Sequence, residues 1–155
     1  EEIRRELQEG GYLRPDTDRK RMKQAKLPPM RFESTDGYPI YVGRNNRQND
    51  ELTFRLARKD DIWCHASKVH GSHVIISCGG TTPPDDTVTQ AAQLAAYYAE
   101  TGGGQNIPVD VTAVKQVKKI PNGKPGMVIY HTYRTVIANP YPDIVVDALN
   151  AETKE

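Results

Sequence analysis

The fold is decided by residues 60–77, which read DDIWCHASKVHGSHVIIS and hold the only tryptophan and three of the four histidines. Residues 62–66 alternate with the two-residue period of a strand, which puts Trp63 and His65 on the same face. The largely β-branched run at residues 73–76 predicts a second, buried strand, and a glycine between the two runs permits a turn. We therefore expect two strands that carry the tryptophan and several imidazoles to one place.

The composition fits one domain with a polar appendage. The chain has 155 residues, of which 37% are hydrophobic, and a formal net charge of +1 at pH 7. Cys64 and Cys78 lack the CxxC spacing of a zinc site or a disulfide framework, so we expect a reducing compartment and a cytoplasmic protein. No apolar run approaches about 18 residues and no signal-peptide pattern opens the chain, which predicts no membrane span.

Three segments are expected along the chain. Residues 1–29 would hold the end of a helix, stopped at Gly10-Gly11, and a linker rich in lysine and arginine. That linker is either solvated or an arm that contacts phosphates. Residues 30–142 would form the domain, and residues 143–155 a C-terminal tail.

Short paired strands begin the domain. Residues 31–34 and 38–42 flank Thr35-Asp36-Gly37, and Asp-Gly between apolar runs predicts a β-hairpin. Because Pro39 has no N–H to donate, the second strand should begin there or lie at an edge of the sheet.

The polar segment 43–50 has two interpretations. It could cap the helix that continues through Leu52 and Leu56, with Asn45 or Asn46 as the N-cap. It could also bind an anion or a nucleic-acid backbone, because one cap needs a single oxygen whereas this segment offers many donors. We favour the second interpretation, with the two arginines of the segment on phosphates and its amides fixing the loop or reading a partner.

A helix and a second hairpin complete the prediction. The helix should span residues 86–100, with an acidic start and the small inner residues Val88, Ala91, Ala92 and Ala95. Residues 109–113 then alternate, turn at Asn122-Gly123, and return over residues 127–138. These elements predict an α+β fold, in which a mixed, mainly antiparallel sheet carries a long helix on one face.

The second hairpin is strongly basic. Residues 107–138 contain five lysine and arginine residues and one aspartate, interleaved with Tyr130, His131 and Tyr133. Cationic and aromatic side chains on a sheet suit RNA, although a merely solvated face would share this composition.

Neither a metal site nor a catalytic site is expected. Strand alternation places Cys64 and His65 on opposite faces, so both cannot bind one metal without distortion. His65 and Ser72 could act as a base and a nucleophile, yet the chain has no nucleophile elbow and no phosphate-loop signature. A histidine beside a tryptophan in a strand is otherwise a packing residue or one that stacks on RNA.

Four motifs, in order along the chain, resemble one family. They are TDGYPIYVG (35–43), GRNNRQNDELT (43–53), DDIWCHASKVHGSHVII (60–76) and VKKIPNGKPGMVIY (117–130). Together they resemble the NFACT RNA-binding domain, NFACT-R, the C-terminal module of the RqcH, NEMF and fibronectin-binding FbpA family. The resemblance covers residues 30–142, and GYLR at residues 11–14 resembles the segment that leaves this family's coiled-coil module.

The resemblance implies a ribosome-associated quality-control factor and no cofactor. Such proteins bind large ribosomal subunits obstructed by peptidyl-tRNA, and in bacteria they recruit alanyl-tRNA so that alanine tails mark the stalled peptide. The expected partners are therefore the large ribosomal subunit, rRNA and tRNA, with no membrane and no small-molecule substrate. The competing expectation is an adhesin module at the cell surface, since streptococcal relatives are described as binding fibronectin.

The residues expected to contact RNA belong to the polar segment, the two central strands and the basic hairpin. They are Arg44, Asn45, Asn46, Arg47, Gln48, Asn49, Trp63, His65, Ser72, His73, Lys115, Lys118, Lys119 and Lys124.

Overall fold

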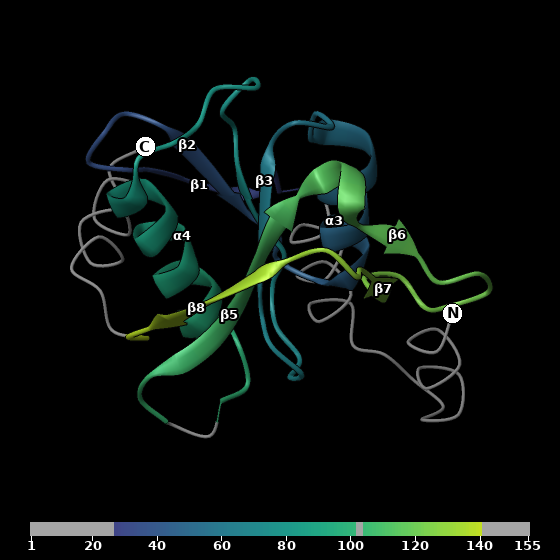
Figure 1. The fold of residues 1–155 in the computed structure, drawn as a ribbon. Coiled ribbons are helices and arrows are strands. Elements are labelled where there is room, and N and C mark those ends of the chain that lie inside the picture. The colour runs from purple at the N-terminus through teal and green to yellow at the C-terminus, as the bar shows by residue number, and fades with distance from the viewer. Residues whose placement is uncertain (1–26, 102–103, 141–155) are drawn as a thin grey trace.

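The computed structural model describes residues 27–101 and 104–140, and its main feature is a six-stranded sheet. The strand order is β1-β2-β4-β3-β5-β8, and every pairing in this sheet is antiparallel. The strands are β1 (Met30–Glu33), β2 (Pro39–Val42), β3 (Ile62–Ala66), β4 (Val74–Ile76), β5 (Ile107–Ala113) and β8 (Arg134–Ala138). Helix α4 (Asp85–Tyr97) covers one face of the sheet, which confirms the predicted α+β fold (Figure 1).

A short helix and a small arm lie on the other side of the sheet. Helix α3 (Asn46–Glu51) continues into a π-helical turn, Leu52–Leu56. The arm is a two-stranded ribbon of β6 (Lys118–Lys119) and β7 (Val128–Ile129), and it lies next to α3 in Figure 1. The sheet therefore separates two layers, and the candidate RNA-contacting residues belong mainly to the layer that lacks α4.

The alternation predicted for the central strand is confirmed. Cys64 and Ala66 pack in the core between the sheet and α4, whereas Trp63 packs on the opposite face with Leu52 and Ile75. β4 pairs with both β2 and β3, so its three residues are all buried, as the β-branched run predicted. The stretch at residues 60–77 thus forms the centre of the sheet and contributes side chains to the hydrophobic clusters on both of its faces.

The first hairpin is also confirmed. β1 pairs with β2, and Gly37 turns the chain at a φ of +87°, a conformation that favours glycine. Ser34 Oγ accepts hydrogen bonds from the backbone N–H groups of Asp36 and Tyr38. β2 begins at Pro39, in agreement with the prediction that this strand starts where proline has no donor.

Helix α4 follows the predicted pattern closely. It begins after Pro84 and has Asp85 and Asp86 in its first turn, where carboxylates stabilise the helix dipole. All four predicted inner residues are buried, and three of them are alanines that let the helix lie close to the sheet. The helix ends at Tyr97, three residues before the predicted boundary.

Two details of the sequence prediction are wrong. The chain after α3 is π-helical, with the N–H of Ala57 donating to Leu52 O at 2.9 Å, and this wider turn leaves Leu56 56% exposed rather than on an inner face. The second hairpin does not close in a two-residue turn. Between β6 and β7 the chain makes one turn at residues 120–123 and another at residues 124–127, closed by N–H···O bonds of 2.9 and 3.1 Å.

The structure describes only part of the chain to which the predicted domain organisation applies. Most of the predicted helix end and basic linker at residues 1–29, and the tail at residues 143–155, lie outside the described residues. Within the described ranges, no helix is long and apolar enough to cross a membrane.

Candidate nucleic-acid interface

The polar segment 43–50 proves to be both a helix cap and a surface. Asn45 is the N-cap of α3, and its Oδ1 accepts a hydrogen bond of 2.8 Å from the N–H of Gln48. Gln48 reaches back, accepting from the N–H of Arg44 through Oε1 at 2.7 Å and donating to Leu27 O through Nε2 at 2.8 Å. The capping interpretation is therefore correct for Asn45 and Gln48, and it leaves the outer side chains of the segment available for binding.

Asn49 is the internal brace of this segment. Its side chain is 3% exposed, its Oδ1 accepts from the N–H of His73 at 3.1 Å, and its Nδ2 donates to Gly71 O at 3.5 Å. Gly43 packs so closely on Asn49 that an added Cβ would lie 1.9 Å from Oδ1. Asn49 therefore holds together three segments of the chain and is not itself a surface residue.

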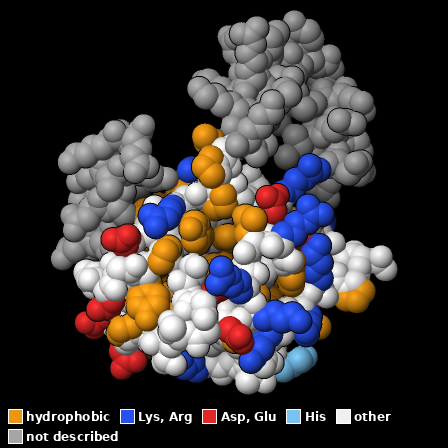
Figure 2. Space-filling view, turned by 90° about the horizontal axis from the view of Figure 1, so that it is seen from above, with side chains coloured by type: hydrophobic (Ala, Val, Ile, Leu, Met, Phe, Trp, Pro, Cys, Tyr) orange, Lys and Arg blue, Asp and Glu red, His pale blue; other side chains and the backbone are white. Residues whose placement is uncertain are grey.

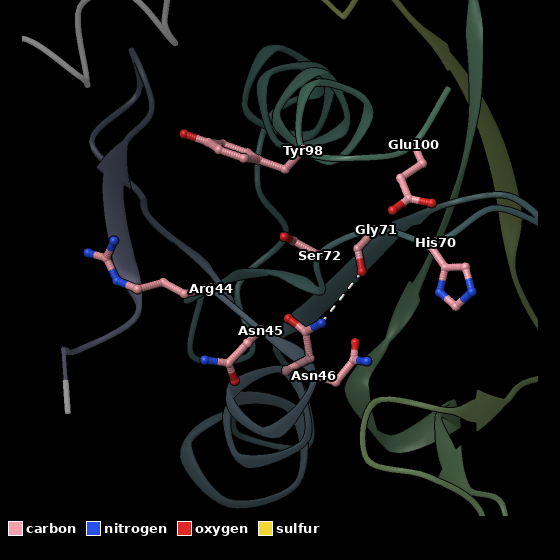
Figure 3. Close-up of a pocket in the computed structure, with 9 residues that line it drawn as sticks. Arg44, Asn45, Asn46, His70, Gly71, Ser72, Tyr98 and Glu100 are labelled. Atoms are coloured by element: carbon pink, nitrogen blue, oxygen red, sulfur yellow. Dashed lines mark hydrogen bonds between the residues drawn. The ribbon is translucent and has the colours of Figure 1, made fainter. Parts of the chain in front are cut away.

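A polar pocket of about 330 Å³ opens beside this brace (Figure 3). It is lined by Arg44, Asn45, Asn46, Asn49, His70, Gly71, Ser72, Tyr98 and Glu100. The side chains come from the start of α3, the turn between β3 and β4, and the end of α4. We call this feature the polar pocket.

The polar pocket joins predicted and unpredicted residues. It collects Arg44, Asn45, Asn46, Asn49 and Ser72, all of which the sequence indicated. It also contains His70, Tyr98 and Glu100, which the sequence did not assign to a site. A bridge between Gly71 and Ala99, and a 2.8 Å hydrogen bond from Glu100 N to His70 O, bring the end of α4 to the β3–β4 turn.

Arg44 and Arg47 differ in how they are held. Arg44 Nε donates to Pro28 O at 2.7 Å, so this guanidinium is anchored at the rim of the polar pocket. Arg47 is exposed in the first turn of α3. Of the two predicted phosphate contacts, Arg44 is therefore anchored to the backbone and Arg47 is exposed on the helix surface.

Trp63, His65 and His73 form a stacked cluster on the face of the sheet that lacks α4. Trp63 lies parallel to His65, with ring centroids 5.6 Å apart, and edge-on to His73 at 5.3 Å. Tyr130 covers Trp63 at a centroid distance of 4.8 Å. Trp63 and His73 are 0% and 1% exposed, so in this structure they shape the surface from below and present no ring to a base. His65 is half-buried.

His73 links the region of the polar pocket to the arm. Its Nε2 donates to Gly126 O at 3.0 Å, and its Nδ1 accepts from the hydroxyl of Thr53 at 2.7 Å. Burial, reinforced by the nearby His65, lowers the pKa of His73 to about 4, although the Gly126 carbonyl opposes this shift. His73 is therefore neutral at pH 7, as a ring with one donor and one acceptor requires.

A second network, centred on the buried Asp110, holds the return of the hairpin against the sheet. Asp110 accepts hydrogen bonds from Tyr130 Oη at 2.5 Å and from Thr135 Oγ1 at 3.1 Å. Burial, together with the carboxylate partner, raises the pKa of Tyr130 above its usual value. The phenol therefore stays protonated and donating throughout the physiological range.

The basic residues form a surface separate from the polar pocket. We call it the basic band, and it consists of Arg55, Arg58, Lys59, Lys115, Lys118 and Lys119, all of which are exposed. A 3.1 Å hydrogen bond from Lys115 N to Lys59 O joins two of its segments. Figure 2 shows lysine and arginine side chains in a row along one side of the molecule. Arg55, Arg58 and Lys59 were missed in the sequence because nothing local links them to the hairpin.

The four lysines predicted to contact RNA on the second hairpin differ in their surroundings. Lys115 pairs with Asp60 at 3.4 Å, and Lys119 pairs with Asp50 at 2.8 Å. Lys119 also lies 5.5 Å from the centroid of the Phe54 ring, which directs it toward the π-helical turn. The predicted lysines are therefore divided, with Lys115 in the body of the domain and Lys118, Lys119 and Lys124 exposed on the arm.

The described residues contain no group of three histidine, cysteine, aspartate or glutamate side chains arranged to hold a metal ion. Cys64 is buried and unbridged, and burial raises the pKa of its thiol to about 12. Cys64 and His65 face opposite sides of β3, as the alternation predicted.

Comparisons with known proteins agree on one family. Residues 29–132 match the NFACT protein RNA binding domain. The chain is 45% identical over 148 residues to the Rqc2 homolog RqcH of Bacillus subtilis and 44% identical over 140 residues to the Rqc2 homolog RqcH of Streptococcus pneumoniae. These matches cover 94% and 90% of this chain but only 25% of each relative, so the chain spans about a quarter of their length.

A solved structure is similar as well. It is the C-terminal part of the fibronectin/fibrinogen-binding protein from Streptococcus suis, with a TM-score of 0.75 and 38% sequence identity. The match covers 94% of this chain and 58% of that one.

Proposed function

This chain belongs to the NFACT protein RNA binding domain family found in RqcH homologues, and from that premise we propose that it binds the large ribosomal subunit during ribosome-associated quality control. The similarity to RqcH over at least 90% of the chain carries this proposal. In it, the module contacts rRNA and tRNA on subunits obstructed by peptidyl-tRNA, and it supports alanine tailing of the stalled chain. A module with this function would act in the cytoplasm.

The surface features favour a binding module over an enzyme. The basic band offers exposed cations for phosphates. The polar pocket offers the amides, the hydroxyl and the tyrosine that line it. His65 and His73 are occupied with structural contacts, and burial lowers the pKa of both. We therefore expect the chain to turn over no nucleotide, ester or phosphodiester.

The test is binding to purified 50S subunits across a salt series. Replacing Arg44 and Arg47 by alanine should weaken binding and reduce the slope of log K against log salt by about 1 for each lost phosphate contact. Arg47→Ala alone separates the phosphate contact from the structural bond that Arg44 makes to Pro28. Arg31→Ala, an exposed arginine on the edge strand β1, is the charge-matched control. Wild-type binding that does not change with salt would contradict the proposal.

Fibronectin binding is the second candidate, and the similar structure from Streptococcus suis motivates it. Immobilised fibronectin, assayed over the same salt series, decides between the two. Saturable binding to fibronectin, with none to 50S subunits, would favour the adhesin function.

A further inference from the structure

The polar pocket carries charges of both signs. Arg44 lies on one side of it and Glu100 on the other, with Gly71 and Ser72 between them (Figure 3). A carboxylate repels a phosphate, so a site for phosphate alone would have cations without Glu100. The basic band is closer to that composition, because its six cations outnumber the two aspartates that pair with Lys115 and Lys119. The polar pocket therefore suits a ligand group that is polar but uncharged.

The other lining groups match the edge and the face of a nucleobase. Asn45, Asn46 and Ser72 contribute amides and a hydroxyl, which can donate and accept hydrogen bonds. Tyr98 contributes a half-buried aromatic ring. Unstacked bases of single-stranded RNA are recognised by such combinations of aromatic faces and polar edges. The volume of about 330 Å³ lies at the small end of the range of roughly 300–1,000 Å³ for ligand sites.

The backbone around the polar pocket is held in place before any ligand binds. At Gly71 an added Cβ would lie 3.0 Å from Ala99 Cβ, so the β3–β4 turn and the end of α4 touch there. The brace Asn49 fixes the start of α3 to that same turn. A preorganised site loses less conformational entropy on binding, which favours discrimination between similar ligands.

We propose that the polar pocket binds one unstacked nucleotide of RNA and prefers guanine, with Glu100 as the residue that selects the base. Guanine presents two neighbouring N–H donors, N1–H and the N2 amino group, to the two oxygens of a carboxylate. Adenine and cytosine place an acceptor nitrogen beside their amino group, and uracil flanks its single N–H with two carbonyls. Each of these would direct a lone pair at Glu100. The proposal rests on the RNA-binding function proposed above and names the RNA feature that this site reads.

The experiment measures the binding of the whole chain to fluorescein-labelled single-stranded oligouridylates that carry one central guanosine, inosine, adenosine or cytidine. Inosine lacks only the N2 amino group of guanosine. We expect guanosine to be preferred over inosine about tenfold, the effect of one hydrogen bond to a charged group. Glu100→Gln should abolish this preference. Glu51→Gln, an exposed glutamate at the end of α3 that does not line the pocket, changes the charge equally and should keep it.

The outcomes separate this inference from the function on which it rests. Equal binding of guanosine and inosine oligonucleotides by the wild type, or a preference that survives Glu100→Gln, overturns the guanine site while leaving general RNA binding intact. Binding to 50S subunits without binding to any oligonucleotide also overturns it. Loss of binding to 50S subunits and to every oligonucleotide at low salt removes both proposals.

Discussion

The polar pocket and the basic band lie on one small domain but are built in different ways. The polar pocket depends on a buried amide, Asn49, and on two glycines: a Cβ at Gly43 would overlap Asn49, and one at Gly71 would be tight against Ala99. The basic band consists of long exposed side chains, and its only ion pairs among the described residues are those of Lys115 and Lys119 with aspartates. Contacts to phosphates position a protein on RNA, whereas contacts to bases give specificity. On the function proposed above, we therefore expect the polar pocket to give selectivity and the basic band to give affinity.

The two surfaces share a support, and removing it should have the largest effect. Trp63 is fully buried beneath His65, His73 and Tyr130, so Trp63→Ala should lower the free energy of unfolding by about 3–5 kcal/mol. Urea denaturation measures this change. Trp63→Phe should cost less, because it keeps a ring and removes the indole N–H, which is buried without a hydrogen-bond partner in the described structure. A loss below about 1 kcal/mol in Trp63→Ala would show that the two surfaces are independent of this core.

The next largest effect should be a loss of folding stability in acid, caused by protonation of His73. The pKa of His73 is about 4 in the folded protein, below its ordinary 6.5, so between these values the unfolded chain takes up a proton that the folded chain does not. Stability from this residue is complete above pH 6.5 and is lost as the pH falls toward 4, by at most about 3 kcal/mol. His65, whose pKa burial also lowers, acts in the same direction.

A pH series of urea denaturation, compared between wild type and His73→Gln, isolates this contribution. Glutamine does not titrate, so the variant should lose less stability than the wild type between pH 7 and pH 4. The same acid-induced loss in both proteins would assign the effect to groups other than His73.

The sequence predicted those parts of the two surfaces that a pattern of neighbouring residues indicates. The period of residues 62–66 indicated the two faces of β3, and the amide-rich segment after Gly43 indicated both a cap and half of the polar pocket. It missed Tyr98 and Glu100 because the Gly71–Ala99 bridge joins positions 28 residues apart, and no local pattern records such a contact. It did not indicate that Asp50 and Asp60 pair with two of the hairpin lysines, because these aspartates come from another part of the chain.

Gly43 offers a way to damage the polar pocket alone. In Gly43→Ala the new Cβ would overlap Asn49 Oδ1, so the amide must move away from Gly71 and His73. We expect a loss of about 1–3 kcal/mol in unfolding free energy, typical of overpacking, and weaker discrimination between RNA bases. Thermal denaturation and oligonucleotide binding measure the two effects.

Gly104→Ala is the matched control, since its Cβ would meet Ile107 Cδ1 at an ordinary 3.4 Å. The salt slope of RNA binding should stay at the wild-type value in Gly43→Ala, because no cation of the basic band has moved. A changed slope would mean that the two surfaces act as one.

The smallest effect on stability, and the clearest on salt dependence, is expected in the basic band. Arg58, Lys59 and Lys118 have no ion pair within the described residues, so each can exchange bulk counterions for an RNA phosphate. Replacing these three by glutamine should reduce the salt slope of 50S binding by about 3, weaken binding to all RNA sequences alike, and leave the melting temperature nearly unchanged.

Lys115→Gln and Lys119→Gln should reduce the slope by less, because each lysine must first leave its aspartate. A salt slope that falls equally for paired and unpaired lysines would mean that these surface ion pairs contribute nothing in solution, as is common for exposed pairs. A slope that does not change in the triple variant would move the phosphate contacts away from the basic band, to Arg44 and Arg47 beside the polar pocket.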